Sequence, residues 1–156
     1  MQQIQPLDIK HHQEAETKIV HFSLPGLLLP NHKLALNMEA RTLTLLSDGP
    51  LLIKEQLFSV NEWRVMLPIL DAFPHYCPYE VLLSQIYCDE ATEASVARYR
   101  QRLQEALSLG TWQHELRPMR RALSSLRNKL HRFDLEISNI RERGCNLTSL
   151  TSRSFP

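Results

Sequence analysis

The feature that most constrains the fold of this chain is a change in the spacing of its apolar residues. Up to about residue 56 they form short runs, which are separated by turn-forming pairs such as Pro25-Gly26 and Asp48-Gly49. Beyond residue 59 they recur every three or four positions. Short runs between turns are typical of antiparallel strands, and the longer period is typical of amphipathic helices. The sequence therefore predicts an α+β fold in which strands precede helices.

Residues 18–56 are expected to form a four-stranded antiparallel sheet. The four apolar runs are KIVHFS, KLALNM, RTLTLL and LLIKEQ. Each run has the length of an ordinary strand, and turn residues separate one run from the next.

Residues 59–133 are expected to form four helices. Ser59 and Glu62 have the spacing of a capping box, which marks the start of the first helix. The second begins near residue 78, the third spans 91–108 and ends at Gly110, and the fourth spans 117–132. In the fourth helix the stripe expected to face inward comprises Met119, Leu123, Leu126 and Leu130.

A β-hairpin is expected over residues 135–150. The segments LEISNI and CNLTSL have strand-like patterns, and the residues between them, Arg141 to Gly144, form the turn.

The two ends of the chain have a different composition. Residues 1–17 are polar, which predicts a flexible N-terminal segment, and residues 151–156 are expected to form a tail. The N-terminal segment lacks the apolar region of a secretory signal, and no apolar run is long enough to cross a membrane. We therefore expect a cytoplasmic protein with one domain over residues 18–150.

Charge is distributed unevenly along the chain, although the net charge is only +1. Residues 1–116 contain nine Lys or Arg and fourteen Asp or Glu, a net charge of −5. Residues 117–156 contain nine and three, a net charge of +6. A basic C-terminal quarter on an acidic body predicts an anionic partner that binds to one face.

The sequence offers little for catalysis or metal binding. Its three cysteines, Cys77, Cys88 and Cys145, match neither a zinc motif nor a disulfide framework, and its seven histidines are scattered. No phosphate-binding loop, nucleophile motif or paired-carboxylate motif is present. We expect no enzyme activity, no metal and no cofactor.

Five segments in the right order resemble one family. They are Arg41-Thr-Leu43 with Asp48-Gly49, then FSVNEWRVMLPIL, VLLSQIY, ALSSLRNKL and LEISNIRERGCNL. Together they resemble the OmpR/PhoB-type effector domain of bacterial transcription regulators, from about residue 34 to residue 150. This resemblance implies a winged helix-turn-helix fold: an N-terminal four-stranded sheet, three core helices and a C-terminal hairpin, the wing.

The chain departs from the family pattern in several places. About thirty residues separate the second helix from ALSSLRNKL, against roughly a dozen in the family, so we expect one extra helix inserted before the recognition helix. Cys145 replaces the aromatic residue of the wing, and Glu142 replaces its first glycine. Residues 1–17 are too short for the receiver domain that usually precedes the sheet, so we expect a stand-alone effector domain.

The recognition helix can be aligned in two ways. The segment from Ser95 to Leu103 also resembles the family's recognition helix, which would place that helix at 94–107. The later helix, 117–132, leads directly into the wing and contains the excess of positive charge, which favours it.

The resemblance implies a transcription regulator that binds double-stranded DNA in a sequence-specific manner. Helix 117–132 would enter the major groove, where arginine can form two hydrogen bonds to guanine, and the wing would reach the minor groove. The residues expected to contact DNA are Arg117, Arg120, Arg121, Ser124, Ser125, Arg127, Asn128, Arg141 and Arg143.

A second hypothesis is a winged-helix module that binds other proteins through helix 91–108, without reading DNA. The narrow apolar stripe of that helix comprises Val96, Tyr99, Leu103 and Ala106. It could pair with a second copy of the chain, a partner regulator or RNA polymerase. Alternatively, it covers the domain's own core.

Overall fold

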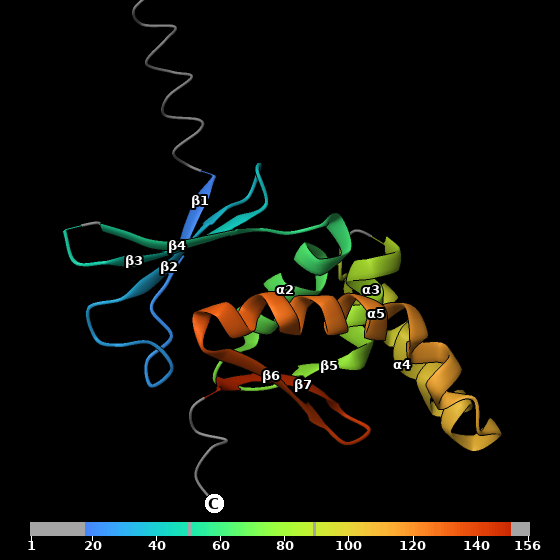
Figure 1. Cartoon of the computed structure of the whole chain (residues 1–156). Helices are drawn as coiled ribbons and strands as arrows, with labels where there is room; N and C mark the ends of the chain where they lie inside the picture. Colours follow the sequence, from blue (N-terminus) through green and yellow to red (C-terminus); the bar gives the residue numbers. More distant parts are fainter. Residues whose placement is uncertain (1–17, 50, 89, 151–156) are drawn as a thin grey trace, which may run out of the picture. The chain divides into compact units, whose positions relative to one another are not determined.

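The computed structural model describes residues 18–49, 51–88 and 90–150 (Figure 1). The expected flexible segment 1–17 and tail 151–156 lie outside the described residues. The described part contains a four-stranded antiparallel sheet, four α-helices and a smaller second sheet, which confirms the predicted α+β class. No helix in these ranges is long and apolar enough to cross a membrane.

The chain divides into two compact units, Met1–Phe58 and Ser59–Pro156. In the first unit, the described strands are β1 (Ile19–Phe22), β2 (Lys33–Asn37), β3 (Thr42–Ser47) and β4 (Leu51–Leu57). They pair antiparallel in chain order, β1-β2-β3-β4, and coincide with the four predicted runs.

Alternation along the two central strands forms the apolar face of this sheet. Leu34 and Leu36 of β2 and Leu43 and Leu45 of β3 are buried, whereas the residues between them are partly exposed. Successive side chains of a strand point to opposite faces, so a leucine at every second position gives one continuous apolar surface.

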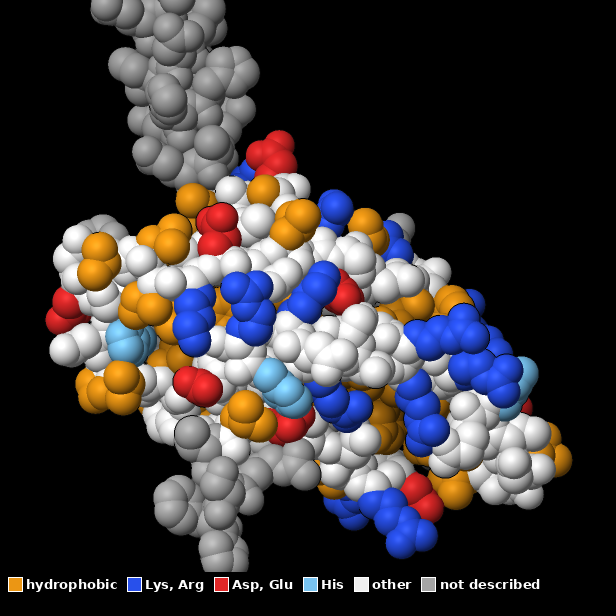
Figure 2. All heavy atoms as spheres, viewed as in Figure 1, with side chains coloured by type: hydrophobic (Ala, Val, Ile, Leu, Met, Phe, Trp, Pro, Cys, Tyr) orange, Lys and Arg blue, Asp and Glu red, His pale blue; other side chains and the backbone are white. Residues whose placement is uncertain are grey.

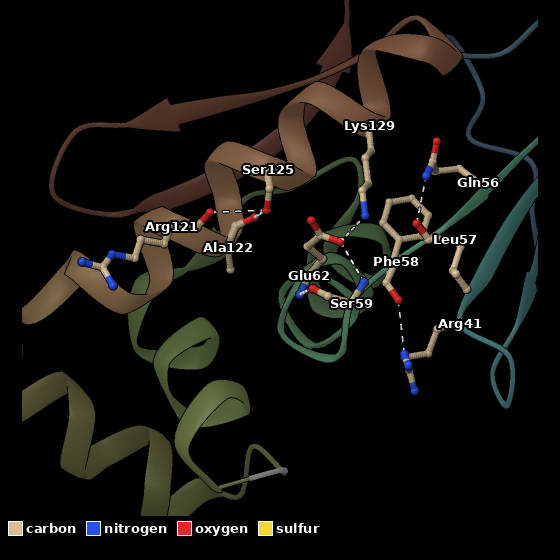
Figure 3. Close-up of polar contacts among 10 residues, drawn as sticks. All are labelled: Arg41, Gln56, Leu57, Phe58, Ser59, Glu62, Arg121, Ala122, Ser125 and Lys129. Atoms are coloured by element: carbon tan, nitrogen blue, oxygen red, sulfur yellow. Dashed lines mark hydrogen bonds and ion pairs between the residues drawn. The ribbon is translucent and has the colours of Figure 1, made fainter.

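The end of β4 is fixed to the β2–β3 connection. The amide of Phe58 donates to the carbonyl of Arg41 at 3.0 Å, and the Arg41 Nε donates to the Phe58 carbonyl at 3.2 Å (Figure 3). These two hydrogen bonds hold Phe58, the last residue of the first unit, against the β2–β3 connection.

The second unit contains four α-helices. They are α2 (Val60–Ala72), α3 (Tyr79–Cys88), α4 (Glu93–Leu109) and α5 (Trp112–Leu130), followed by the short 3-10 helix η1 (His131–Phe133). The predicted capping box of α2 is present, because the Glu62 amide donates to Ser59 Oγ and the Ser59 amide donates to Glu62 Oε1. Thr92 and Ser95 form a second capping box at α4, and Gly110 ends that helix in a left-handed conformation.

The predicted bounds of the fourth helix, 117–132, were wrong. The helix α5 begins at Trp112 and ends at Leu130, with Pro118 inside it. Proline is common in the first turn of a helix, which made residue 118 look like a start. Two contacts of the preceding turn favour helix there instead: Leu116 is buried, and the Trp112 ring meets the Tyr79 ring edge-on at 5.9 Å.

The hairpin over residues 135–150 is confirmed as β6 (Leu135–Ile140) and β7 (Gly144–Ser149). The short strand β5 (Cys77–Pro78) adds to β7, so that the second sheet has the order β5-β7-β6. The sequence did not predict β5. The close approach of β5 to β7 requires a glycine at position 144, because a Cβ there would lie 2.0 Å from the Cys77 carbonyl oxygen.

Candidate nucleic-acid interface

The helix α5 has one buried face and one exposed face. The buried residues are Leu116, Met119, Ala122, Leu123, Leu126 and Leu130, which include all four that the sequence placed inward. The exposed residues on the opposite side include Arg117, Arg120, Arg121, Ser124, Ser125 and Asn128. The apolar stripe therefore fixes which side chains of α5 face outward.

An ion pair connects α5 to the start of α2. Lys129 Nζ lies 2.7 Å from Glu62 Oε1, and only 4% of Glu62 is exposed (Figure 3). The same carboxylate oxygen accepts the Ser59 amide of the capping box at 2.8 Å. Glu62 thus caps α2 and binds α5 at the same time.

The environment of Glu62 favours its ionised form. Burial by itself raises the pKa of this carboxyl group, but hydrogen bonds from Lys129, Ser125 and the Ser59 backbone, together with the charge of Lys129, hold the pKa below the ordinary value of a glutamate. The hydroxyl of Ser125 is also 3.2 Å from the Ala122 carbonyl. Ser125 thus has contacts within the chain, and its predicted contact with DNA stays a prediction.

The lowered pKa of Glu62 predicts loss of stability in acid. A carboxyl group whose pKa is lowered by folding stabilises the folded state above its unfolded pKa, and this stabilisation is lost as the pH falls through the folded value. The free energy of unfolding should therefore decrease as the pH drops below about 4.5. Chemical denaturation over a series of pH values should give a steeper decrease for the wild type than for Glu62→Gln.

The matched control for this measurement is Glu39→Gln. Glu39 pairs with Lys18 at 3.5 Å on the surface, where 68% of the Glu39 side chain is exposed. Because exposed pairs contribute little, its pH profile should match that of the wild type. Parallel profiles for the wild type and Glu62→Gln would show that the Glu62 carboxylate does not stabilise the fold.

Arg127 connects the other flank of α5 to β6. Its Nε donates to the Ile137 carbonyl at 3.1 Å, and its Nη2 donates to Asn139 Oδ1 at 2.7 Å. These two hydrogen bonds give Arg127 a structural role, and its predicted contact with DNA stays a prediction. The sequence could not indicate the two hydrogen bonds, because the acceptors lie on a strand that the chain reaches only after η1.

Five of the predicted arginines have no such contacts. They are Arg117, Arg120 and Arg121 on α5, and Arg141 and Arg143 at the β6–β7 turn. Each is exposed, and none makes an ion pair or side-chain hydrogen bond with the described residues. Figure 2 shows basic side chains along α5 and at the tip of the hairpin. The structure thus brings together five unpaired positive charges within the second unit.

The arginines of α4, in contrast, interact within the chain. Arg100 Nε lies 2.9 Å from Glu80 Oε2, and Arg102 Nη2 lies 3.2 Å from Glu115 Oε2. Arg98 Nη2 lies 3.5 Å from the Cys88 sulfur, and its guanidinium lies over the Tyr99 ring. These contacts leave α4 with less unpaired positive charge than α5.

The apolar stripe of α4 packs inside the second unit. Tyr99, Leu103 and Ala106 are buried, and Val96 is half-buried. Tyr99 also stacks on Tyr87 of α3 at 5.7 Å. Of the two alternatives for this stripe, burial supports the one in which it covers the chain's own core.

The tip of the hairpin contains a residue in an unusual conformation. Glu142 has a φ of 61°, in the left-handed region that favours glycine. This is the position at which the OmpR/PhoB-type pattern has its first glycine. The turn therefore keeps the backbone shape that a glycine would permit, and it places Arg141 and Arg143 on either side of the strained residue.

The cysteines and the remaining acids form no metal-binding group in the described part of the chain. Cys77 and Cys145 are opposite each other on β5 and β7, and burial raises the pKa of Cys77 to about 12 and that of Cys145 to about 11. Such thiols stay protonated and unreactive. Among residues 18–49, 51–88 and 90–150, no three His, Cys, Asp or Glu side chains are grouped as a metal site would require.

No family model matches this chain, and neither a curated protein nor a solved structure matches it.

Proposed function

We propose that this protein is a transcription regulator that binds double-stranded DNA in a sequence-specific manner through a winged helix-turn-helix. In this proposal α5 is the recognition helix, the β6–β7 hairpin is the wing, and α4 is the inserted helix. The order of α2, α3, α5 and the hairpin resembles that of the OmpR/PhoB-type effector domain, which supports the proposal.

One observation carries the proposal: the unpaired arginines occur where such a domain would meet DNA. Arg117, Arg120 and Arg121 are exposed on α5, and Arg141 and Arg143 flank the hairpin turn. The arginines of α4 are neutralised by acids or packed on an aromatic ring. Unpaired guanidinium groups pair well with phosphates and with guanine.

The contacts of α5 also suit this role. It has 19 residues, so it is about 28 Å long and can enter a major groove. Lys129 and Arg127 connect its C-terminal half to α2 and β6, which fixes its orientation before DNA binds. In the proposed docking Arg117, Arg120, Arg121, Ser124 and Asn128 face base edges or phosphates, and the wing arginines reach a minor groove.

The alternative function, a protein-interaction module, depended on the apolar stripe of α4. That stripe has less support as a partner surface, because three of its four residues are buried within this chain. Homodimerisation, a partner regulator and RNA polymerase as partners stay predictions from the sequence.

The salt dependence of binding tests the proposed function. If the five arginines neutralise phosphates, the logarithm of the association constant should fall with the logarithm of salt concentration at a slope of roughly −4 to −5. The measurement is a fluorescence titration of a labelled duplex at several salt concentrations. The duplex should come from selection out of a random pool, which also reveals whether half-sites repeat.

The selected duplex and a scrambled duplex of the same composition form the control pair. Sequence-specific readout predicts tighter binding of the selected duplex at every salt concentration. Equal binding of the selected and scrambled duplexes would show that binding is not sequence-specific. No binding to any duplex at low salt would contradict DNA binding itself.

A further inference from the structure

A groove of about 440 Å³ lies between the C-terminal half of α5 and the strand β6. Ser124 and Asn128 line it from α5, His131 lines it from η1, and Ser138 and Asn139 line it from β6. Ser124 and Asn128 are exposed residues to which the sequence assigned contacts with DNA. The groove therefore opens on the face of α5 that would meet DNA under the proposed function.

His131 continues the outward row of Ser124 and Asn128. The three positions are separated by four and three residues, and His131 still has helical backbone angles, with φ −58° and ψ −27°. Such a spacing places side chains on one side of a helix. The His131 side chain is 39% exposed, and the sequence gave no reason to assign it a role. The structure thus adds a histidine to the proposed interface.

A buried carboxylate orients the imidazole ring of His131. The Nε2 atom lies 3.0 Å from Glu136 Oε2, and only 6% of the Glu136 side chain is exposed. The other oxygen, Oε1, accepts the Ile137 amide at 3.0 Å, which fixes the carboxylate on β6. The Nδ1 of His131 has no hydrogen bond with any described residue. One ring nitrogen is therefore held within the chain, and the other is left for a ligand.

The charged residues within five positions of His131 are Arg127, Lys129, Arg132, Asp134 and Glu136. Arg127 donates to β6, Lys129 pairs with Glu62 of α2, and Arg132 and Asp134 are exposed. Among the described residues that line the groove, the charged ones are Arg127 and Glu136, whose charges are opposite. A proton on His131 therefore makes this groove positive.

We propose that His131 contacts a phosphate of the DNA backbone and takes up a proton from solvent when it does so. This inference rests on the proposed function. A neutral imidazole that donates from Nε2 to Glu136 has a lone pair on Nδ1, which a phosphate repels. The imidazolium donates from both nitrogens, so it can bind the carboxylate and the phosphate at once. Ser124 and Asn128 supply further donors to the same phosphate.

The position of Glu136 explains why the contact requires a proton. A carboxylate in a groove that faces DNA would repel a phosphate. The imidazole is more exposed than the carboxylate, so a phosphate in the groove meets the imidazole first. If His131 only held η1 on β6, its neutral form would suffice and DNA affinity would not depend on its charge.

The test measures binding of a selected duplex to the full chain at pH 6, 7 and 8 and constant ionic strength. Because binding takes up a proton, the association constant should be at least fivefold higher at pH 6 than at pH 8. Calorimetry at pH 7 in two buffers of different ionisation enthalpy should show a net uptake of protons. The salt slope should also be steeper by about one at pH 6 than at pH 8, because one more phosphate is neutralised.

Three variants assign the proton. His131→Gln keeps an amide donor for Glu136, so it should fold, as circular dichroism would verify, and its association constant should change less than twofold between pH 6 and pH 8. His75→Gln, in the exposed connection between α2 and β5, is the matched control. His114→Gln removes an exposed histidine of α5 outside the groove. The last two variants should keep the pH dependence of the wild type.

Three results would overturn the inference: no proton uptake by the wild type, an unchanged pH dependence in His131→Gln, or loss of that dependence in His114→Gln. The first of these uses no variant, so it holds even if His131→Gln does not fold. Sequence-specific binding that does not vary with pH would contradict this inference alone. Absence of binding to any duplex at low salt would instead contradict the proposed function.

Discussion

Replacing Gly144 with alanine should destabilise the protein by about 3 kcal/mol, because overpacking against rigid atoms is costly. The added Cβ would lie 2.0 Å from the Cys77 carbonyl oxygen and 2.9 Å from the Pro78 Cα. Both neighbours are backbone atoms, which cannot move aside as a flexible side chain can. The clash should separate β5 from β7, and chemical denaturation should measure the loss.

The matched control is Gly110→Ala at the end of α4. Gly110 has a φ of 76° and open space around the position of a Cβ, so alanine there adds backbone strain without a clash. Its cost should be only about 1 kcal/mol. Hydrogen exchange supplies a second readout: the Tyr79 amide, which donates to the Arg143 carbonyl at 3.0 Å, should lose protection in Gly144→Ala and keep it in Gly110→Ala. Equal costs for the two variants would contradict the steric explanation.

Replacing Arg120 and Arg121 together with alanine should weaken binding to a selected duplex about 100-fold. Each arginine that pairs with a base or phosphate is expected to contribute about 1–3 kcal/mol, and 1.4 kcal/mol corresponds to a factor of ten. Neither side chain has an ion pair or side-chain hydrogen bond with the described residues, so the melting temperature should stay within a few degrees of the wild type. A duplex titration on the folded variant measures the loss.

The control is the double variant Arg98→Ala and Arg102→Ala, which removes the same charge from α4. It should reduce affinity only slightly, through weaker general attraction, because Arg102 already pairs with Glu115 and Arg98 packs on Tyr99. The opposite ranking would assign the recognition helix to residues 94–107, the rival alignment. The comparison of the two double variants therefore tests whether a helix binds in the groove and, if so, whether that helix is α5 or α4.

Much of the fold could be predicted because its signals are local. The strand runs, the capping box of Ser59 and Glu62 and the stop at Gly110 depend on residues a few positions apart, and the structure confirms them. The inward stripe of α5 could also be predicted, because a helix of period 3.6 places residues 119, 123, 126 and 130 on one face.

The features that could not be predicted depend on contacts between distant segments. The strand β5 has two residues, and only its pairing with β7 makes it a strand. The start of α5 depends on Leu116 and Trp112 packing against other elements, which outweighs the usual preference for Pro118 in a first turn. The hydrogen bonds of Arg127 to β6 and the contact of Ser125 with Glu62 also join distant segments, so the sequence did not indicate them.

The residues that attach α5 to its neighbours are different from those that it exposes, and this difference affects how the protein can evolve. Lys129 and Arg127 attach the helix to its neighbours, while Arg117, Arg121, Ser124 and Asn128 are exposed and contribute little to those attachments. Under the proposed function, substitutions at the exposed positions should therefore change which DNA sequence is bound at little cost in stability. A scaffold of this kind can diversify its target while the frame that presents the helix is retained.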